Sequence, residues 1–479
     1  MADVASRRFC AINYACLRST SFRARRVARR KPAQTQNRAC MDGKKNMRDK
    51  PTRRDLLQTA ATLAATSAIA LNRAPAHAKG PADAAAGTLP QVDAILRAAV
   101  NAEDVPGIVA MAASEAGVVY EGAFGSRRIH EAPAMTRDTI FRVASMVKLI
   151  TSVAALQLVE QGKLALEAPV PAIDPAIAAP QVLHGFDTAG RPVLRPARRP
   201  IALRDLLTHT AGFVYRLWDS EAWKYEKAVD KLPAAQRRKL PRAPLMFDPG
   251  ERWQYGGNID WVGRIVQAVS GEPLDAYFRK HIFEPLGMSD TGFVVSPAQW
   301  ERAASGHRRQ PDGSLQAEPA ERPPKWPPPP QSFSGGGGIY SSAPDYLTLI
   351  RMLMRGGEIE GARILRRDTV ALMGQNQIGQ IDVGVLRTTV PAVSNDVDFF
   401  PGIKLKWGFG HMITTQPVPD GRSADSLTWA GIYNTYYWID PRKHVAAVFM
   451  TQVLPFADER VLRVYRQFER GIYAAVKAG

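Results

Sequence analysis

Residues 426–452 read SLTWAGIYNTYYWIDPRKHVAAVFMTQ. Three runs rich in β-branched and aromatic residues are separated by short breaks, one of which is the turn pair Asp440-Pro441. Such runs between turn residues predict three consecutive strands. A closing helix is predicted over 458–477, because apolar residues recur there at helical spacing. These residues are Val461, Leu462, Val464, Tyr465 and Phe468.

The other end of the body mirrors this pattern. Residues 90–107, PQVDAILRAAVNAEDVPG, predict an amphipathic helix closed by Pro106-Gly107. Residues 108–125, IVAMAASEAGVVYEGAFG, contain the alternating and apolar runs of a β-hairpin. Strands and a helix at both ends indicate that the two ends meet in one antiparallel sheet, flanked by an N-terminal and a C-terminal helix.

The middle of the chain is predicted to be mostly helical. Helical spacing of apolar residues covers 148–162, 203–208, 259–270 and 274–282, and loops rich in proline and glycine separate these stretches, especially 322–338. The predicted fold class is therefore α+β. Its sheet lobe comprises about 79–140 and 339–479, and a mostly helical lobe of about 141–338 is inserted between them.

The positive charge of the chain is concentrated in its first 78 residues. The formal net charge is +18, and residues 1–78 hold 17 Lys and Arg against 4 Asp and Glu, which leaves +5 for the other 401 residues. That remainder shows no basic stripe interleaved with aromatic residues, so we expect no nucleic-acid partner. The three cysteines (Cys10, Cys16 and Cys40) lie in the same leading segment. The sequence after it therefore offers no disulfide, no thiolate metal ligand and no cysteine nucleophile.

The leading segment has the pattern of an export signal. A twin arginine at 53–54 precedes an apolar stretch at 59–71 and a small-x-small cleavage site at 76–78. We expect export of residues 79–479 to the periplasm or the exterior, from a true start at Met1, Met41 or Met47. The alternative is an N-terminal helix with an arginine-rich flank. The apolar stretch is short and rich in Ala and Thr, so no integral membrane segment is expected in the mature chain.

The stretch FRVASMVKLI, residues 141–150, holds the only serine in the chain with a lysine three positions later. At the start of a predicted helix, Ser145 and Lys148 would share one face. A serine nucleophile needs a proton acceptor within hydrogen-bond reach, and a helix N-terminus favours an alkoxide. Lys148 lies among apolar residues, so it could take the proton itself or hold another base by its charge. The alternative is a capping serine beside a surface lysine.

A second candidate is Tyr255 in WQYGGNIDWVG, residues 253–263. Two glycines follow the tyrosine, and a helix with apolar spacing begins directly after them. A tyrosine on such a turn can bring its phenol against the Ser145–Lys148 pair, where it would serve as general base for the serine and as general acid for the leaving group. The alternative is a part-buried core tyrosine with a satisfied hydroxyl.

Five motifs occur in the order found in one family. They are FRVASMVKL (141–149), RDLLTHTAGF (204–213), WQYGGNIDWVG (253–263), SGGGGIYSS (334–342) and LTWAGIYNT (427–435). This set resembles the β-lactamase-related serine hydrolases, which comprise class C β-lactamases, penicillin-binding DD-peptidases and esterases of the same fold. The similarity covers about residues 90–475 and implies the serine β-lactamase fold.

The resemblance implies a role for each matching position. Ser145 matches the acylated serine, Lys148 its partner on the helix, and Tyr255 the tyrosine of the second motif. Trp429-Ala430-Gly431 takes the place of the third motif, on the strand that edges the substrate site. The oxyanion hole of the family corresponds to the backbone N–H groups of Ser145 and Ile432.

Two departures from the family pattern bear on the substrate. Many lactamases have Asn two positions after the tyrosine, but Gly257 stands there and Asn258, a candidate substrate contact, follows it. The third motif also lacks the Lys or His that grips a substrate carboxylate, because Trp429 replaces it. A buried anion without a charged partner is costly, so a neutral ester is favoured. The esterase branch is the most similar, and acyl transfer to an alcohol or amine remains open.

Other readings of the sequence stay open beside the esterase. A β-lactamase or DD-peptidase is the first alternative, and a penicillin-binding or sensing homologue without turnover is the second. His209 is interpreted as structural because no Gly-x-Ser-x-Gly elbow accompanies it, and the 8 histidines show no metal spacing. Gly335–Gly338 is read as a loop beside the site or as a flexible connector. We expect a small-molecule ester or lactam as substrate, and neither a cofactor nor a metal.

Overall fold

A computed structural model describes residues 89–319 and 332–478 of the chain. The export signal expected in residues 1–78 and part of the proline-rich stretch lie outside the described residues. None of the helices in the two described ranges combines the length and the apolar character that a membrane crossing requires.

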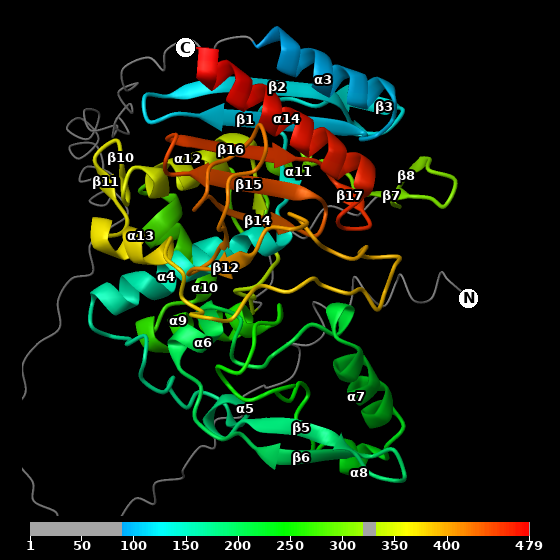
Figure 1. The fold of residues 1–479 in the computed structure, drawn as a ribbon, viewed down its shortest axis with the longest axis vertical. Helices are drawn as coiled ribbons and strands as arrows, with labels where there is room; N and C mark the ends of the chain where they lie inside the picture. The colour runs from blue at the N-terminus through cyan, green and yellow to red at the C-terminus, as the bar shows by residue number, and fades with distance from the viewer. Residues whose placement is uncertain (1–88, 320–331, 479) are drawn as a thin grey trace, which may run out of the picture. The chain divides into compact units, whose positions relative to one another are not determined.

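The centre of the fold is an eight-stranded antiparallel sheet with the strand order β12-β13-β14-β15-β16-β1-β2-β3 (Figure 1). Its strands are β1 (Gly107–Ala113), β2 (Val118–Arg128), β3 (Glu131–Ala134), β12 (Leu405–Trp407), β13 (Met412–Thr414), β14 (Leu427–Gly431), β15 (Thr435–Asp440) and β16 (Val445–Met450). Strand β1 pairs with β16 and sets Val109 opposite Met450, which joins the two ends of the body. The predicted hairpin, the three predicted strands and the α+β class are confirmed.

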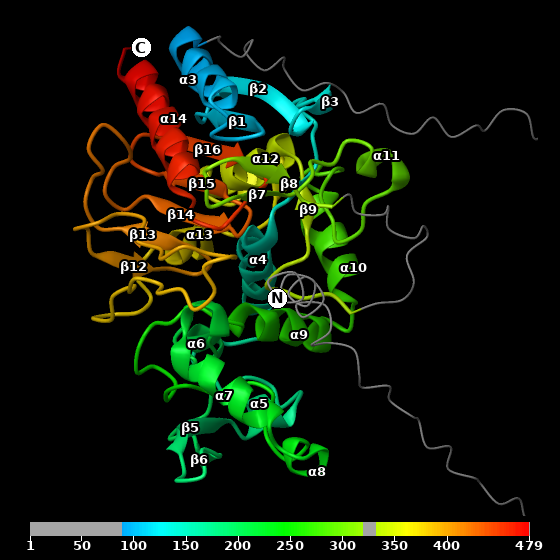
Figure 2. The ribbon, with the colours of Figure 1, turned by 90° about the vertical axis from the view of Figure 1, so that its right-hand side faces the viewer.

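Helices cover both faces of this sheet, which explains why β15 and β16 are buried along their whole length. Helices α3 (Pro90–Asn101) and α14 (Glu459–Ala478) lie together on one face (Figures 1 and 2). On β15, Trp438 packs against Phe468 of α14 with ring centroids 5.6 Å apart. The next side chain points the opposite way, and Tyr437 packs against Tyr346 of α12 (Ala343–Met354) at 5.5 Å. Both predicted terminal helices are therefore confirmed.

The helical part of the chain is built around α4 (Val147–Glu160), which is buried along nearly its whole length and packs against α9 (Asn258–Ser270). The predicted helices at 148–162, 203–208 and 259–270 are confirmed as α4, α6 (Leu203–Leu207) and α9. The helix predicted at 274–282 is α10 (Leu274–Phe278), which continues into a π-helical turn, η3 (Arg279–Phe283). The smaller elements are α5 (Pro175–Ala178), η2 (Arg216–Trp218), α7 (Ser220–Asp230), α8 (Ala234–Arg237), α11 (Pro297–Trp300), α13 (Arg367–Met373) and the pairs β5–β6 (Gln181–Phe186, Pro192–Pro196), β7–β8 (His307–Arg309, Leu315–Ala317) and β10–β11 (Glu358–Ile359, Ala362–Arg363), with β17 (Val453–Leu454) beside β7.

A short strand pair positions the segment that carries Ser145. Strand β4 (Phe141–Arg142) pairs with β9 (Tyr340–Ser341), and the 3-10 turn η1 (Ala144–Met146) follows β4 and leads directly into α4. The pairing brings the glycine-rich loop before β9 against the start of α4. Gly335 and Gly336 are buried and bonded to α4 through Lys148 and Thr151, so this part of the loop is not a loose connector.

Candidate active site

Ser145 lies in the turn η1, at the junction of the strand pair and α4. Ala144 before it has a φ of 46°, a left-handed conformation that non-glycine residues rarely adopt and that is common near functional sites. The hydroxyl of Tyr346 donates to the carbonyl of Met146 at 2.9 Å and fixes the turn from the sheet side. Ser145 itself is half-buried, so its hydroxyl stays within reach of a small molecule while its neighbours are buried.

Lys148 is brought onto Ser145 as the i, i+3 spacing predicts. Its side chain is 1% exposed, and its Nζ lies 3.1 Å from Ser145 Oγ and 2.6 Å from the carbonyl oxygen of Gly336. Among the described residues, no carboxylate forms an ion pair with this amine. Two aromatic rings face it instead, with Nζ 5.0 Å from the ring centroid of Tyr255 and 5.4 Å from that of Tyr215. A buried amine without a carboxylate partner keeps its hydrogen-bonding capacity for the serine.

Tyr255 is fixed by aromatic neighbours on several sides. Its side chain is 2% exposed, and its hydroxyl oxygen accepts a hydrogen bond from Nε1 of Trp429 at 3.2 Å. Its ring centroid lies 4.8 Å from that of Trp429, 4.7 Å from that of His209 and 5.5 Å from that of Trp218. These contacts leave the ring little rotational freedom and hold the phenol between Trp429 and Lys148.

Two tyrosines face Lys148, but their hydroxyl groups have different hydrogen-bond partners. The hydroxyl of Tyr215 donates to Asp260 Oδ2 at 3.0 Å. Burial and the Asp260 carboxylate raise the pKa of Tyr215 well above its usual value, so this phenol keeps its proton and cannot act as a base. No carboxylate in the described part of the chain is bonded to the Tyr255 hydroxyl, which accepts from an indole N–H instead. Of the two, only Tyr255 is suited to proton transfer.

The glycine loop holds the Lys148 amine in position. The carbonyl of Gly336 accepts from Lys148 Nζ at 2.6 Å, and the carbonyl of Gly335 accepts from Thr151 Oγ1, one turn along α4, at 2.7 Å. On its other side the loop is bonded to α9, because Ser334 Oγ donates to Asp260. The same hydroxyl accepts from the N–H of Gly336 within the loop. The loop thus connects the serine helix to the helix that follows the tyrosine motif.

Glycine is required at position 335 because the loop lies directly on the backbone of α9. A Cβ at Gly335 would lie 2.5 Å from the carbonyl oxygen of Ile259 and 2.9 Å from Cα of Gly263, whereas a Cβ at Gly337 would meet nothing within 4 Å. We therefore expect Gly335→Ala to reduce the free energy of unfolding by about 1–3 kcal/mol, as overpacking does.

The matched control in the same loop is Gly337→Ala, expected to change the free energy of unfolding by less than about 0.5 kcal/mol. Urea denaturation of both variants measures the difference. Equal midpoints for the two variants would show that the loop moves away from α9 without loss of stability.

The third-motif strand lies against the segment that leads into Ser145. A Cβ at Gly431 would lie 2.4 Å from the carbonyl oxygen of Val143, so only glycine allows β14 to approach this closely. Trp429 and Ala430 are buried, and the Trp429 ring packs against that of Tyr255. Ile432 begins the turn after β14 and is half-buried. Its N–H donates to no acceptor within residues 89–319 and 332–478, which leaves this donor available to a substrate oxygen.

Asn258 does not fit the expected contact with substrate. Its side chain is fully buried, and Nδ2 forms hydrogen bonds to the carbonyl of Phe213 at 2.8 Å and to His209 Nδ1 at 3.0 Å. At the first position of α9 the amide turns inward and fixes the loop that carries His209. The prediction for Asn258 is corrected accordingly: its side chain stabilises the wall of the site.

His209 is structural, as expected, but it lies closer to the site than the sequence indicates. Burial, and to a smaller extent the charge of Lys148, lower the pKa of His209 well below its usual value, so the ring is neutral. It packs between Tyr255 and Trp407, with ring centroids 4.7 and 5.2 Å away. Sequence reasoning missed Tyr215, Trp218, Asp260 and Ser334, because no local spacing links them to Ser145.

The chain is similar to known proteins over most of its length. Residues 92–471 match the β-lactamase family. The chain is 31% identical over 415 residues, 83% of its length and 97% of the relative's, to ML-236A carboxylate methylbutanoyltransferase of Penicillium citrinum. It is 29% identical over 399 residues, 81% of its length and 99% of the relative's, to lovastatin esterase of Penicillium rubens.

Solved structures give the same result. A mutant of simvastatin synthase from Aspergillus terreus superposes with a TM-score of 0.71 at 30% identity, and the match covers 82% of this chain and 100% of the synthase chain. The family match spans the sheet, the Ser145 helix, the tyrosine motif and the β14 strand together. The chain therefore belongs to the β-lactamase family.

Proposed function

We propose that this chain is a serine esterase and acyltransferase that works through an acyl group on Ser145. The observation that carries the proposal is the contact of the buried Lys148 amine with Ser145 Oγ at 3.1 Å, next to the Tyr255 phenol, which accepts from the indole of Trp429. This combination supplies a nucleophile and a site for its proton. Relatives of similar length are named as acyltransferases and as an esterase, which supports the same chemistry here.

In the first half-reaction Ser145 Oγ attacks the ester carbonyl, and the Lys148–Tyr255 pair takes up the proton of the hydroxyl. The carbonyl oxygen becomes an anion that the N–H groups of Ser145 and Ile432 bind. When the carbon–oxygen bond to the alcohol breaks, the proton passes through the Tyr255 hydroxyl to the leaving oxygen. The product is a free alcohol and an acyl ester on Ser145.

In the second half-reaction an acceptor attacks the acyl ester on Ser145. The proton of the acceptor goes to the Lys148–Tyr255 pair and then to Ser145 Oγ as the acyl group leaves. Water as acceptor gives hydrolysis, and an alcohol gives transfer. Trp429 and its aromatic neighbours make the Tyr255 side of the site apolar, which favours a bound alcohol with an apolar body over water.

A second candidate, β-lactamase or DD-peptidase activity, follows from the family match itself. The third motif argues against it, because the buried Trp429 offers no positive charge to a substrate carboxylate. We expect turnover of p-nitrophenyl acetate and butyrate at a kcat/KM at least about 100-fold above that for nitrocefin, since one missing charge-assisted contact is worth roughly 3 kcal/mol.

Comparable turnover of nitrocefin would contradict the ester assignment. A fluorescent penicillin that labels Ser145 and is never released would instead indicate a penicillin-binding homologue without turnover. Addition of a primary alcohol to the ester assay separates transfer from hydrolysis, because transfer yields a new ester in place of free acid.

We also propose that the enzyme is exported. The twin arginine at 53–54, the apolar stretch at 59–71 and the small-x-small site at 76–78 support this location. The expected mature chain begins near Lys79, and the mass of the protein recovered from the periplasm or the medium measures it.

A further inference from the structure

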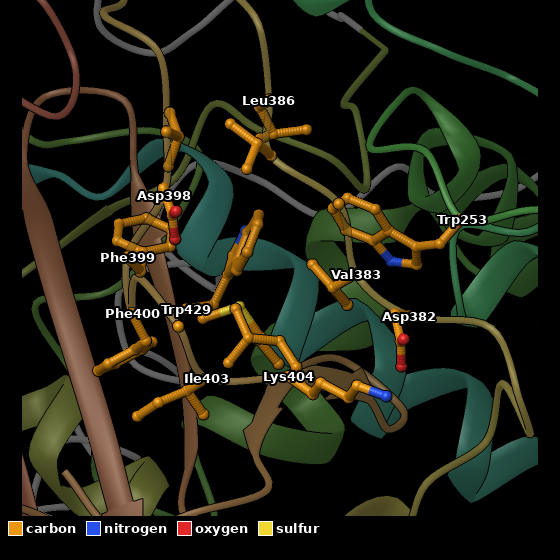
Figure 3. A pocket seen from close by; sticks show the side chains of 16 residues that line it. Trp253, Asp382, Val383, Leu386, Asp398, Phe399, Phe400, Ile403, Lys404 and Trp429 are labelled. Carbon is orange, nitrogen blue, oxygen red and sulfur yellow. The ribbon is translucent and has the colours of Figure 1, made fainter.

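A cavity of about 250 Å³ lies on the outer side of Trp429 (Figure 3). The long connection before β12 forms most of its wall, and Trp253 closes it on the side of the helical lobe. Its apolar lining includes Trp253, Val383, Leu386, Phe399 and Trp429.

The inner wall of this cavity is apolar and its rim is charged. Leu386 and Phe399 of the long connection and Trp429 of β14 converge toward the same space in Figure 3. The three charged lining residues, Asp382, Asp398 and Lys404, are exposed, so they lie toward solvent and do not place a charge at the base. Such a space suits an uncharged apolar group with polar substituents at its outer end.

The cavity adjoins the candidate active site through two tryptophans. Trp429 donates to the Tyr255 hydroxyl at 3.2 Å, and the ring centroid of Trp253 lies 6.5 Å from that of Tyr255. On β14, Trp429 and Gly431 point to the same face, about 7 Å apart along the strand. Gly431 lies against Val143, two residues before Ser145. A substrate with its carbonyl at Ser145 can therefore extend along β14 past Trp429.

The position of the Tyr255 hydroxyl decides whether the acyl end or the alcohol end of an ester points toward the cavity. A general acid must lie within hydrogen-bond reach of the leaving oxygen that it protonates. This hydroxyl is held at Trp429, on the side of the cavity. The leaving oxygen, and the alcohol attached to it, must then lie on the same side, while the acyl group points away.

We propose that the cavity bounded by Trp253, Trp429 and residues 382–405 is a subsite for the apolar alcohol portion of the ester, and for the acceptor alcohol in transfer. The proposal rests on the proposed function and extends it to the substrate class: a neutral alcohol with an apolar body of several carbon atoms. The acyl group is selected elsewhere.

The test uses two series of esters and the full-length enzyme. One series holds the acyl group constant as acetate and lengthens the alcohol from ethanol to octanol; the other holds ethanol constant and lengthens the acid. In the alcohol series kcat/KM should rise about fourfold per methylene until the cavity is filled. In the wild type, a rise confined to the acid series would overturn the proposal.

A substitution that fills the cavity localises the effect. Val383 is half-buried in its wall, and Val383→Trp should flatten the dependence on alcohol length while the dependence on acid length stays as in the wild type. Val476→Trp, at an exposed valine on α14, is the matched control and should keep both dependences. An unchanged alcohol dependence in a Val383→Trp protein with the wild-type melting temperature would overturn the proposal.

A fluorophosphonate label separates failure of the subsite from failure of the proposed function. If Ser145 is labelled and esters are hydrolysed without preference for long alcohols, the subsite assignment is wrong and the serine esterase stands. If Ser145 takes no label and no ester is hydrolysed, the proposed function is wrong and the subsite assignment falls with it.

Discussion

Replacing Ser145 by alanine is expected to lower kcat/KM for every ester that the enzyme accepts by roughly 10⁴- to 10⁶-fold, the range typical for loss of a serine nucleophile. The reason is chemical, because no other described hydroxyl receives a hydrogen bond from Lys148. The fold should survive, because Ser145 is half-buried and its neighbours in η1 are held by Tyr346. Steady-state rates and the mass of the intact protein after incubation with ester measure the effect.

The control for this variant lies on the same helix. Ser152 is fully buried, and its hydroxyl donates to the carbonyl of Lys148 at 2.8 Å, a local bond that adds little to helix stability. Ser152→Ala should keep turnover within a few-fold of the wild type. If Ser145→Ala still gains the mass of an acyl group, another nucleophile carries the reaction and the assignment of Ser145 is wrong.

Replacing Tyr255 by phenylalanine should lower kcat by about 10²- to 10⁴-fold, the usual contribution of a positioned acid–base group. The aromatic contacts with Trp429, His209 and Trp218 remain in this variant, so the packing of the site is kept. The loss should be larger for ethyl acetate than for p-nitrophenyl acetate, because a poor leaving alkoxide needs a proton more than a phenolate does. Steady-state kinetics with the two esters measure this difference.

The matched control is Tyr225→Phe on α7. Tyr225 is also buried, and its hydroxyl makes one hydrogen bond, to the carbonyl of Pro241 at 2.6 Å. Tyr225→Phe should lose some stability, but its relative activity on the two esters should stay as in the wild type. An equal loss of activity on both esters in Tyr255→Phe would show that the phenol orients Lys148 and does not donate the proton.

The sheet could be predicted from the sequence because its signals are local. The runs in 426–452 and 108–125 carry strand composition and turn residues within a few positions of each other, and the structure forms β14, β15, β16, β1 and β2 there. The approach of Lys148 to Ser145 follows from helix geometry alone, since residues three apart share one face. The similarity of five ordered motifs then connected the distant parts of the chain.

The remaining features depend on contacts that no local pattern encodes. Tyr215, Asp260 and Ser334 come from three separate segments and meet only when α9 and the glycine loop pack together. The sequence predicts a substrate contact for Asn258 because it adjoins the tyrosine motif, but the first turn of α9 points its amide at His209. The segment 382–405 forms no helix or strand over most of its length, so the cavity that it lines could not be predicted from a local pattern.

The pairing of β1 with β16 has a consequence during synthesis. These strands lie about 340 residues apart in the chain, so a central pair of the sheet cannot form until nearly all of the protein has left the ribosome. At a synthesis rate of about 5–20 residues per second, strand β16 is made roughly 20 to 70 seconds after the N-terminal hairpin. Throughout that interval the apolar edge of β1, which is wholly buried in the finished protein, is open to chaperones and to aggregation.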